Sequence, residues 1–522
     1  MPSWLNQAVF YEVYPQSFSD SDGDGIGDIP GMMQRLPYIA ECGFNAIWLN
    51  PWFSSSFRDA GYDITDYYRV APRYGTNDDA GNFLNECHRL GIKVVLDLVI
   101  GHVSIDHPWF EESCKLEHNR CSDLFIWSPV VSWRGAPDEE DDYYISGWSS
   151  RGAFKANFFA VQPAFNFGFN KTRFDWEMPY DSEIPMKNRE VVRKIMRFWL
   201  DMGCDGFRVD MAHSMIKRDP GYEKTMEFWQ DIREMFDREY PEAVLISEWF
   251  HPQYSLAGGF HMDFTNCANL FRNESWMACR RRNEPVIMSP KYSGGLAKWL
   301  GDYREMLDKV DGRGLTGFYS GNHDRWRMSY YASPESMIVN MAMIFTMPGC
   351  PFLYYGDELG MRYIPGVQTE GSGSRGGSRT PMQWDRSPNL GFSSAEPGRL
   401  YLPVDPAPDA PVVSEALAGR NPIFNAVKEL ILLHKSHPAF AADGKFDLLH
   451  GETDTFPLVY MRSPKDGDGK LIAALNPTEQ SVECPLPAGN YKPVWSYRFA
   501  KGELGGEHIS MPPVSVMIAS VS

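Results

Sequence analysis

The sequence predicts an α/β protein built as a closed barrel of eight parallel strands, a (β/α)8 or TIM barrel. Eight short apolar segments recur between residues 8 and 355, and segments with helical periodicity separate several of them. Six of the eight strands end in, or run into, polar residues. The carboxyl ends of barrel strands meet at one face of the barrel, so we expect these polar residues to form the functional site.

The predicted strands are short and rich in aliphatic and aromatic residues, as strands covered on both faces are. They span residues 8–14, 44–49, 93–100, 206–210, 243–248, 259–264, 315–320 and 351–355. Amphipathic helices are predicted at 31–42, 77–90, 191–202, 222–238 and 421–435. The polar residues at the strand ends are Asn50, His102, Asp210, Glu248, Asn322-His323-Asp324 and Asp357-Glu358.

Two parts of the chain do not fit the strand-helix repeat. Residues 104–173 are too long for one helix, are rich in Trp, Phe, Asp and Asn, and include the charge run Asp138 to Asp142. We expect an inserted subdomain B there, placed over the barrel mouth after the third strand. Residues 441–522 alternate in short strands and turns, which predicts a C-terminal antiparallel β-sandwich domain. The barrel would comprise residues 1–103 and 174–440, with a Gly/Ser-rich loop from Gly366 to Arg379.

Bulk composition excludes several classes of partner. The chain has 68 acidic and 50 basic residues and a formal net charge of −18, whereas nucleic acids and anionic membranes require a basic surface. No secretory signal or membrane span is visible, and the nine cysteines form no C-x-x-C pair, so we expect reduced thiols and a cytoplasmic protein. A neutral ligand suits this composition, and oligomeric state is left open.

An acidic loop follows the first strand. Asp20, Asp22, Asp24 and Asp28 alternate with glycines, and together with the carbonyl of Ile26 they offer the oxygen ligands that Ca²⁺ prefers. The loop lacks the final Glu of an EF-hand, and the alternative is a solvated acidic turn. We favour a structural Ca²⁺ site, because crowded carboxylates repel one another without a cation.

Three carboxylates after neighbouring strands predict the chemistry. Arg208 and Asp210 fall on one side of their strand, which indicates either an ionised nucleophile or a structural ion pair. Glu248 is followed by Trp249 and Phe250, and an apolar wall favours a protonated acid. One ionised and one protonated carboxyl group are the equipment of a retaining glycoside hydrolase. The neutral rings of His102 and His323 would hydrogen-bond sugar hydroxyls.

These stretches resemble the α-amylase family, glycoside hydrolase family 13. Residues 97–102, 206–213, 247–249 and 321–324 are similar to its four signatures, in the same order. The resemblance implies Asp210 as the nucleophile, Glu248 as the acid/base and Asp324 as the residue that holds sugar hydroxyls and stabilises the transition state. It also places Arg208, His102 and His323 in the site.

Further motifs resemble the oligo-1,6-glucosidase and trehalose synthase branches of that family. Asp59-Ala60-Gly61-Tyr62 is similar to an element whose Asp and Tyr hold the terminal sugar, and residues 378–384 imply Arg379 as another sugar contact. The acidic loop resembles the calcium loop of the same branches. There are departures: Gly101 stands where most members have Asn, and Arg325-Trp326-Arg327 after Asp324 suggests an unusual aglycone.

The sequence therefore predicts a retaining, exo-acting α-glucosidase or α-glucosyltransferase on short α-glucosides, with Ca²⁺ and no organic cofactor. Its partner would be a small oligosaccharide or α-glucoside. Trehalose synthase-like isomerisation of maltose is the alternative, and a catalytically silent amylase-like binding protein is a remote one. Linkage and aglycone are left open.

Overall fold

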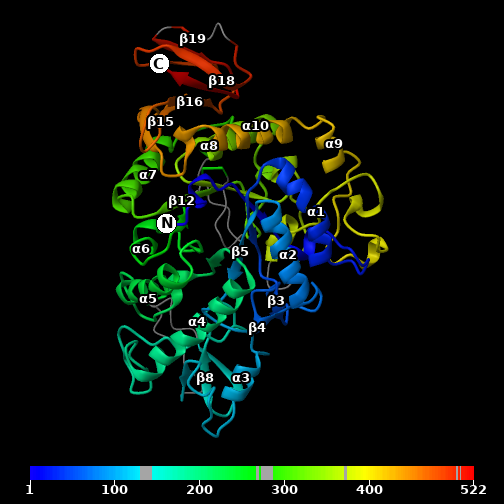
Figure 1. Cartoon of the computed structure of the whole chain (residues 1–522), viewed down its shortest axis with the longest axis vertical. Helices are drawn as coiled ribbons and strands as arrows, with labels where there is room; N and C mark the ends of the chain where they lie inside the picture. The colour runs from blue at the N-terminus through cyan, green and yellow to red at the C-terminus, as the bar shows by residue number, and fades with distance from the viewer. Residues whose placement is uncertain (130–143, 266–269, 272–285, 369–372, 501–503, 506) are drawn as a thin grey trace.

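The computed structural model describes residues 1–129, 144–265, 270–271, 286–368, 373–500, 504–505 and 507–522. A closed barrel of eight parallel strands lies at its centre (Figure 1), in the order β1-β13-β12-β11-β10-β9-β5-β2. Seven of the predicted strands contain one of them, and the eighth, 351–355, overlaps the last, which begins one residue earlier, so the predicted barrel is confirmed. Their bounds are β1 Phe10–Val13, β2 Ala46–Leu49, β5 Lys93–Leu98, β9 Gly206–Val209, β10 Val244–Ser247, β11 Met262–Phe264, β12 Leu315–Tyr319 and β13 Cys350–Tyr354.

Helices surround the barrel, and local sequence signals set their ends. Asp28 caps α1 by accepting a hydrogen bond from the Gly31 N–H at 2.6 Å, and Thr76 opens α2 with a capping box to Asp79. Gly203 ends α4 in the left-handed region, φ 114°, where glycine carries no steric cost. The longer helices are α1 Ile29–Cys42, α2 Asn77–Arg89, α4 Glu183–Met202, α5 Glu223–Glu239, α7 Leu296–Val310, α8 Pro334–Thr346 and α10 Pro422–Ser436.

The register between neighbouring strands brings charged residues together at the carboxyl end of the barrel. In the β5–β9 pair, Asp97 lies opposite Arg208. Both side chains are almost fully buried, although most of the barrel interior is aliphatic or aromatic. A buried charge is tolerated only when it is paired, so this strand pair already indicates an ionic cluster beneath the site.

Two smaller β-structures extend from the barrel at opposite ends of the long axis of the molecule (Figure 1). The insertion contains α3 Pro108–Ser113 and a three-stranded sheet of β6 Trp127–Ser128, β8 Gly152–Lys155 and β7 Tyr144–Ser149. The predicted charge run Asp138 to Asp142 lies outside the described residues. A short hairpin, β3 Phe53–Ser55 and β4 Ile64–Val70, precedes α2.

The C-terminal part consists of antiparallel sheets, as predicted. One has the order β14-β15-β16-β21-β18 and the other β17-β20-β19. A separate apolar cluster, which includes Ile472, Ile509 and Met517, packs between them. The bounds are β14 Lys445–His450, β15 Leu458–Ser463, β16 Lys470–Asn476, β17 Val482–Pro485, β18 Tyr491–Tyr497, β19 Leu504–Gly505, β20 His508–Met511 and β21 Ser515–Val521.

The remaining described segments are short. They include α6 Pro252–Ser255, α9 Val413–Leu417 and the 3-10 helix η6, Gly373–Ser378. Helix η6 lies within the predicted Gly/Ser-rich loop, and residues 369–372 of that loop are not among the described residues. Among the helices described, none has the length and apolar character needed to cross a membrane.

Candidate active site

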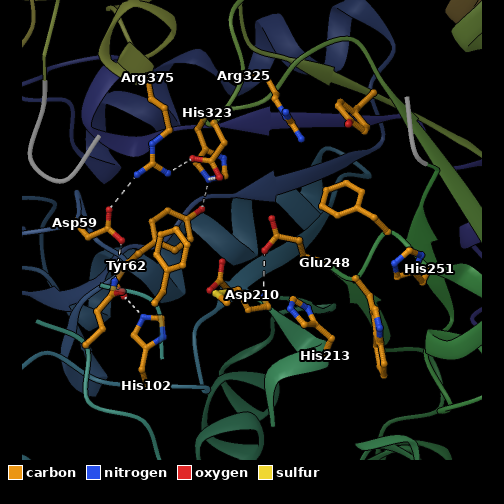
Figure 2. A pocket seen from close by; sticks show the side chains of 17 residues that line it. Asp59, Tyr62, His102, Asp210, His213, Glu248, His251, His323, Arg325 and Arg375 are labelled. Carbon is orange, nitrogen blue, oxygen red and sulfur yellow. Dashed lines mark hydrogen bonds and ion pairs between the residues drawn. The ribbon is translucent and has the colours of Figure 1, made fainter. Parts of the chain in front are cut away.

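A cavity of about 360 Å³ opens where the barrel strands end. Seven of the nine sequence-predicted catalytic and sugar-binding residues line it (Figure 2): Asp59, Tyr62, His102, Asp210, Glu248, His323 and Asp324. The other two, Arg208 and Arg379, lie behind the carboxylates and are 2% and 0% exposed. The structure thus brings all nine together.

Arg208 is the centre of the ionic cluster. Its guanidinium lies 2.7 Å from Asp97, 3.1 Å from Asp210 and 2.9 Å from Glu248. Burial raises the pKa of Asp210 well above its usual range, the charge of Glu248 raises it further, and Arg208 only partly opposes them. The ionised Asp210 expected from its pairing with Arg208 is not what this pKa indicates for the free site, because burial and the charge of Glu248 outweigh the single positive charge of Arg208.

Glu248 is held close to Asp210 by the backbone as well. The N–H of Met211, the residue after Asp210, donates to Oε2 of Glu248 at 3.1 Å. Met211 adopts φ 43°, a left-handed conformation that a side chain rarely takes without a local reason. The turn after β9 thus aims an amide at the second carboxyl group, and the two carboxyl groups face the same cavity.

Asp324 is the best-neutralised carboxylate of the site. It lies 3.1 Å from Arg379, 2.5 Å from Arg375 and 3.5 Å from the ring of His323. Burial alone would raise its pKa, but the neighbouring ring of His323 and the charges of Arg375 and Arg379 hold that pKa well below its usual range. Asp324 is therefore ionised at neutral pH, and its oxygens can accept hydrogen bonds from sugar hydroxyls.

Arg375 also closes one end of the cavity. It reaches from η6 and lies 3.5 Å from Asp59, so it bridges Asp59 and Asp324 (Figure 2). Asp59 also accepts a hydrogen bond from Gln162 at 2.8 Å. Burial raises the pKa of Asp59 to about 7, against the opposing charges of Arg375 and Arg379. This end of the cavity thus contains a carboxyl group that titrates near neutral pH.

A hydrogen-bonded chain orients His323 and Tyr62. Nε2 of His323 lies 2.7 Å from the Tyr62 hydroxyl, which in turn donates to Asp97 at 2.8 Å. On its other side, Nδ1 lies 2.8 Å from the buried carboxyl group of Glu12 on β1. Burial lowers the pKa of His323 well below its usual value, so the ring is neutral, as predicted. The two rings stack with centroids 5.1 Å apart.

His102 is held by a residue of the insertion. Asn157 Nδ2 lies 3.3 Å from Nδ1 of His102, and Nε2 of His102 lies 3.0 Å from the Tyr62 carbonyl oxygen. Burial lowers the pKa of His102 to about 4. A Cβ at Gly101 would lie 2.8 Å from Asn157 Nδ2. The glycine at 101 therefore leaves room for an amide that comes from another part of the chain.

The opposite side of the cavity has a different character. His213, His251 and Arg325 lie there (Figure 2), and the lining of the cavity also includes Met211, Trp249, Phe250 and Tyr319. A second cavity of about 1130 Å³ adjoins it and shares Phe158, Met211 and His213 with it. The other arginine of the unusual run, Arg327, is fully buried away from the cavity and bonds the Tyr355 carbonyl oxygen at 2.7 Å and Asp357 at 3.0 Å.

Sequence reasoning missed five residues of this network: Glu12, Asp97, Asn157, Gln162 and Arg375. Glu12 and Asp97 carried a usable signal, since each is an acidic residue within an otherwise apolar barrel strand. Arg375 lies in a Gly/Ser-rich run that reads as a loop. Asn157 and Gln162 come from the irregular insertion, and only the tertiary structure brings them to the barrel.

The acidic loop lies apart from the cavity. Carboxylate oxygens of Asp20, Asp22 and Asp28 converge within 4.8 Å of one another. Asp24 does not join this group, and its carboxylate accepts the Ile26 N–H at 2.8 Å. Burial raises the pKa of Asp28, and the charge of Asp20 adds a smaller increase. Carboxylates are the ligand type that Ca²⁺ takes, and these three would supply part of the roughly six to eight oxygens that the ion requires.

A barrel with carboxylates and neutral histidines around one cavity at its strand ends defines a glycoside hydrolase or transglycosylase. The chain belongs to the alpha-amylase family: the model of its catalytic domain matches residues 12–443.

Relatives of known activity cover almost the whole chain. The trehalose synthase/amylase of Mycobacterium tuberculosis (strain CDC 1551 / Oshkosh) is 31% identical over 558 residues, covering 98% of this chain and 87% of the relative. The oligo-1,6-glucosidase of Parageobacillus thermoglucosidasius is 30% identical, covering 93% and 92%. An isomaltulose synthase mutant from Erwinia rhapontici NX5 in complex with D-glucose shares the fold, with TM-score 0.83, 23% identity and full coverage of both chains.

Proposed function

We propose that this protein is a retaining, exo-acting α-glucosidase or α-glucosyltransferase that uses Asp210 as nucleophile and Glu248 as acid/base. One observation carries the proposal: both carboxyl groups bind the same Arg208 guanidinium, and Glu248 also accepts the N–H of the residue after Asp210. A paired nucleophile and proton donor in one cavity is what double displacement requires.

The reaction follows from this pairing. Asp210 attacks the anomeric carbon while protonated Glu248 gives its proton to the glycosidic oxygen, so the C–O bond breaks and a glycosyl ester forms on Asp210. Glu248, now ionised, takes a proton from water or from a sugar hydroxyl, which attacks the ester and restores Asp210. Two inversions give net retention.

Asp324, Tyr62 and His323 would hold the glucosyl ring. Ionised Asp324 accepts hydroxyl protons, and its charge stabilises the oxocarbenium-like transition state. His102 lines the same cavity, but both of its ring nitrogens already have protein partners. The Asp59–Arg375–Asp324 bridge closes the far end of the cavity, which favours a single terminal sugar and hence exo action.

Transfer to a sugar within the site is the alternative outcome, and the trehalose synthase relatives favour it. Purified protein should be incubated with maltose, sucrose, isomaltose and trehalose, with product identity and anomeric configuration followed by NMR. The hydrolase proposal expects α-glucose as the first product. Trehalose that accumulates from maltose without matching glucose would establish the isomerase instead, and β-glucose as the first product would refute retention.

The other predictions have indirect support. Asp20, Asp22 and Asp28 would hold Ca²⁺, which would neutralise their charges and stiffen the loop before α1. The seven described cysteines are all free thiols, which supports a reducing, cytoplasmic environment. We retain the proposal that no organic cofactor takes part, since the residues of the cavity supply the acid, base and nucleophile themselves.

A further inference from the structure

Arg325 lies on the leaving-group side of the catalytic cavity. It follows the carboxyl end of β12 directly after Asp324, and its side chain enters the cavity above Glu248, on the side away from Asp59 (Figure 2). A group bonded to the anomeric carbon must extend past Glu248, the proposed proton donor. Arg325 is thus placed to contact the aglycone and not the glucosyl ring.

The other cations of the site are already neutralised. Arg208 binds Asp97, Asp210 and Glu248, Arg375 binds Asp59 and Asp324, and Arg379 binds Asp324. Arg325 differs from them. Within the part of the chain that the structure describes, no carboxylate, carbonyl oxygen or aromatic ring contacts its guanidinium, although its backbone carbonyl accepts the Ser378 hydroxyl at 2.5 Å.

Arg325 is half-buried, and it has no ionic partner within the part of the chain that the structure describes. The protein has a formal net charge of −18, and acidic partners are abundant on its surface. A guanidinium that faces a ligand cavity without an acidic partner presents a planar fork of N–H donors, which matches the two oxygens of a carboxylate or phosphate. The surrounding aromatic side chains lower the local polarity and strengthen such a contact.

We propose that Arg325 forms an oxyanion subsite, so that the preferred substrates are α-glucosides whose aglycone bears a carboxylate or a phosphate. This inference rests on the proposed glucosidase function. It also explains why one cation is needed there: Asp210, Glu248 and Asp324 would repel an anionic aglycone unless a positive charge offset them.

Matched substrates test the charge directly. One pair is the 2-O-α-glucoside of glycerol and that of glyceric acid, and the other is maltose with and without a phosphate on the 6-hydroxyl of its reducing unit. We expect kcat/KM to favour the anionic member of at least one pair, and the two pairs distinguish a carboxylate from a phosphate aglycone. Arg325→Gln should lower that preference by about 10- to 100-fold.

A matched arginine near the other end of β12 provides the control. Arg313 is exposed and precedes the amino end of β12, on the opposite face of the barrel. Arg313→Gln should leave the preference as it is in the wild type. The preference should also weaken as ionic strength rises, because the contact is partly exposed to solvent.

Binding to an inactive variant separates this inference from the proposed reaction. Calorimetric titration of the Asp210→Asn protein should show tighter binding of the glyceric acid glucoside than of the glycerol glucoside, and adding Arg325→Gln should abolish the difference. If the wild type hydrolyses none of the four glucosides, the proposed function fails, while this titration still decides the subsite. Equal affinities, or equal losses for both members of a pair, would overturn the oxyanion subsite.

Discussion

The two sides of the catalytic cavity are built differently. Around the glucosyl position, nearly every polar group has a partner: Asp324 has two arginines, Asp59 has Arg375 and Gln162, and Tyr62 bonds both His323 and Asp97. On the leaving-group side, where His213, His251 and Arg325 lie (Figure 2), the cation has no acidic partner among the described residues.

This difference separates the residues that serve the chemistry from the residues that select the aglycone. A fixed network is preorganised for one ring shape and costs no rearrangement when charge develops at the anomeric carbon. The leaving-group side has few such bonds, so its residues can contact a different aglycone without disturbing the network. The chemistry should therefore be sensitive to every change on the glucosyl side, while changes on the other side alter which aglycone is accepted.

The largest effect should come from the nucleophile. Asp210→Asn should lower kcat by about 10³-fold or more on every α-glucoside that the wild type accepts, because only positioning and electrostatics remain. The exposed Asp308 on α7 offers the matched control, since Asp308→Asn should keep full turnover and the same Tm. Turnover within tenfold of the wild type for Asp210→Asn would remove this residue from its role.

Substitution of Asp59 should give the next largest effect, and its effect on stability should depend on pH. Its pKa of about 7 lies above that of an unfolded Asp, about 3.9, so the native state keeps this proton while the unfolded chain releases it. The free energy of unfolding should therefore fall as pH rises from about 4 through 7. Asp59→Asn removes this contribution, so the Tm of the variant relative to the wild type should increase across that window.

The same variant should lower kcat/KM about 10- to 100-fold, because a charge-assisted contact to a terminal sugar hydroxyl is lost. Thermal melts and kinetics at pH 4.5, 6 and 8 check both expectations, with Asp308→Asn run in parallel. A difference in Tm that does not change with pH would show that Asp59 is not the titrating group.

A smaller effect should arise where the insertion meets the glucosyl side. Gly101→Asn should push Asn157 away from His102 and lower kcat/KM about tenfold, since the new Cβ would lie 2.8 Å from Asn157 Nδ2. Asn157→Ala added to Gly101→Asn should recover part of the loss by removing the clash. Gly81→Asn is the control, because nothing lies within 4 Å of a Cβ there. A double variant worse than Gly101→Asn would contradict this coupling.

The acidic loop should affect stability more than catalysis, because it lies outside the cavity. Chelation should lower the Tm by about 3 °C through loss of a ligand of the native state, with kcat nearly unchanged. Differential scanning calorimetry with added Ca²⁺ should restore it, and Asp22→Asn should abolish the response. No bound calcium by elemental analysis, together with an unchanged Tm, would discard the site.

The sequence predicted the eight barrel strands and the face of the barrel at which Asp210, Glu248 and Asp324 meet, because hydrophobic runs and polar strand ends are local signals. It did not predict that the pKa of Asp210 is raised. The pKa of Asp210 depends on Asp97 and Glu248, which share Arg208 with it across three strands. Contacts such as Asn157–His102 join residues 55 positions apart, and no local pattern encodes them.

Two side-chain hydrogen bonds join the insertion to the glucosyl side of the cavity. They run from Gln162 to Asp59 and from Asn157 to His102. Partial opening of the insertion would break both while the barrel stayed folded. Hydrogen exchange in residues 144–173 should therefore slow when a sugar binds, and a protease that cuts the insertion should abolish sugar affinity before it changes the helical signal of the barrel.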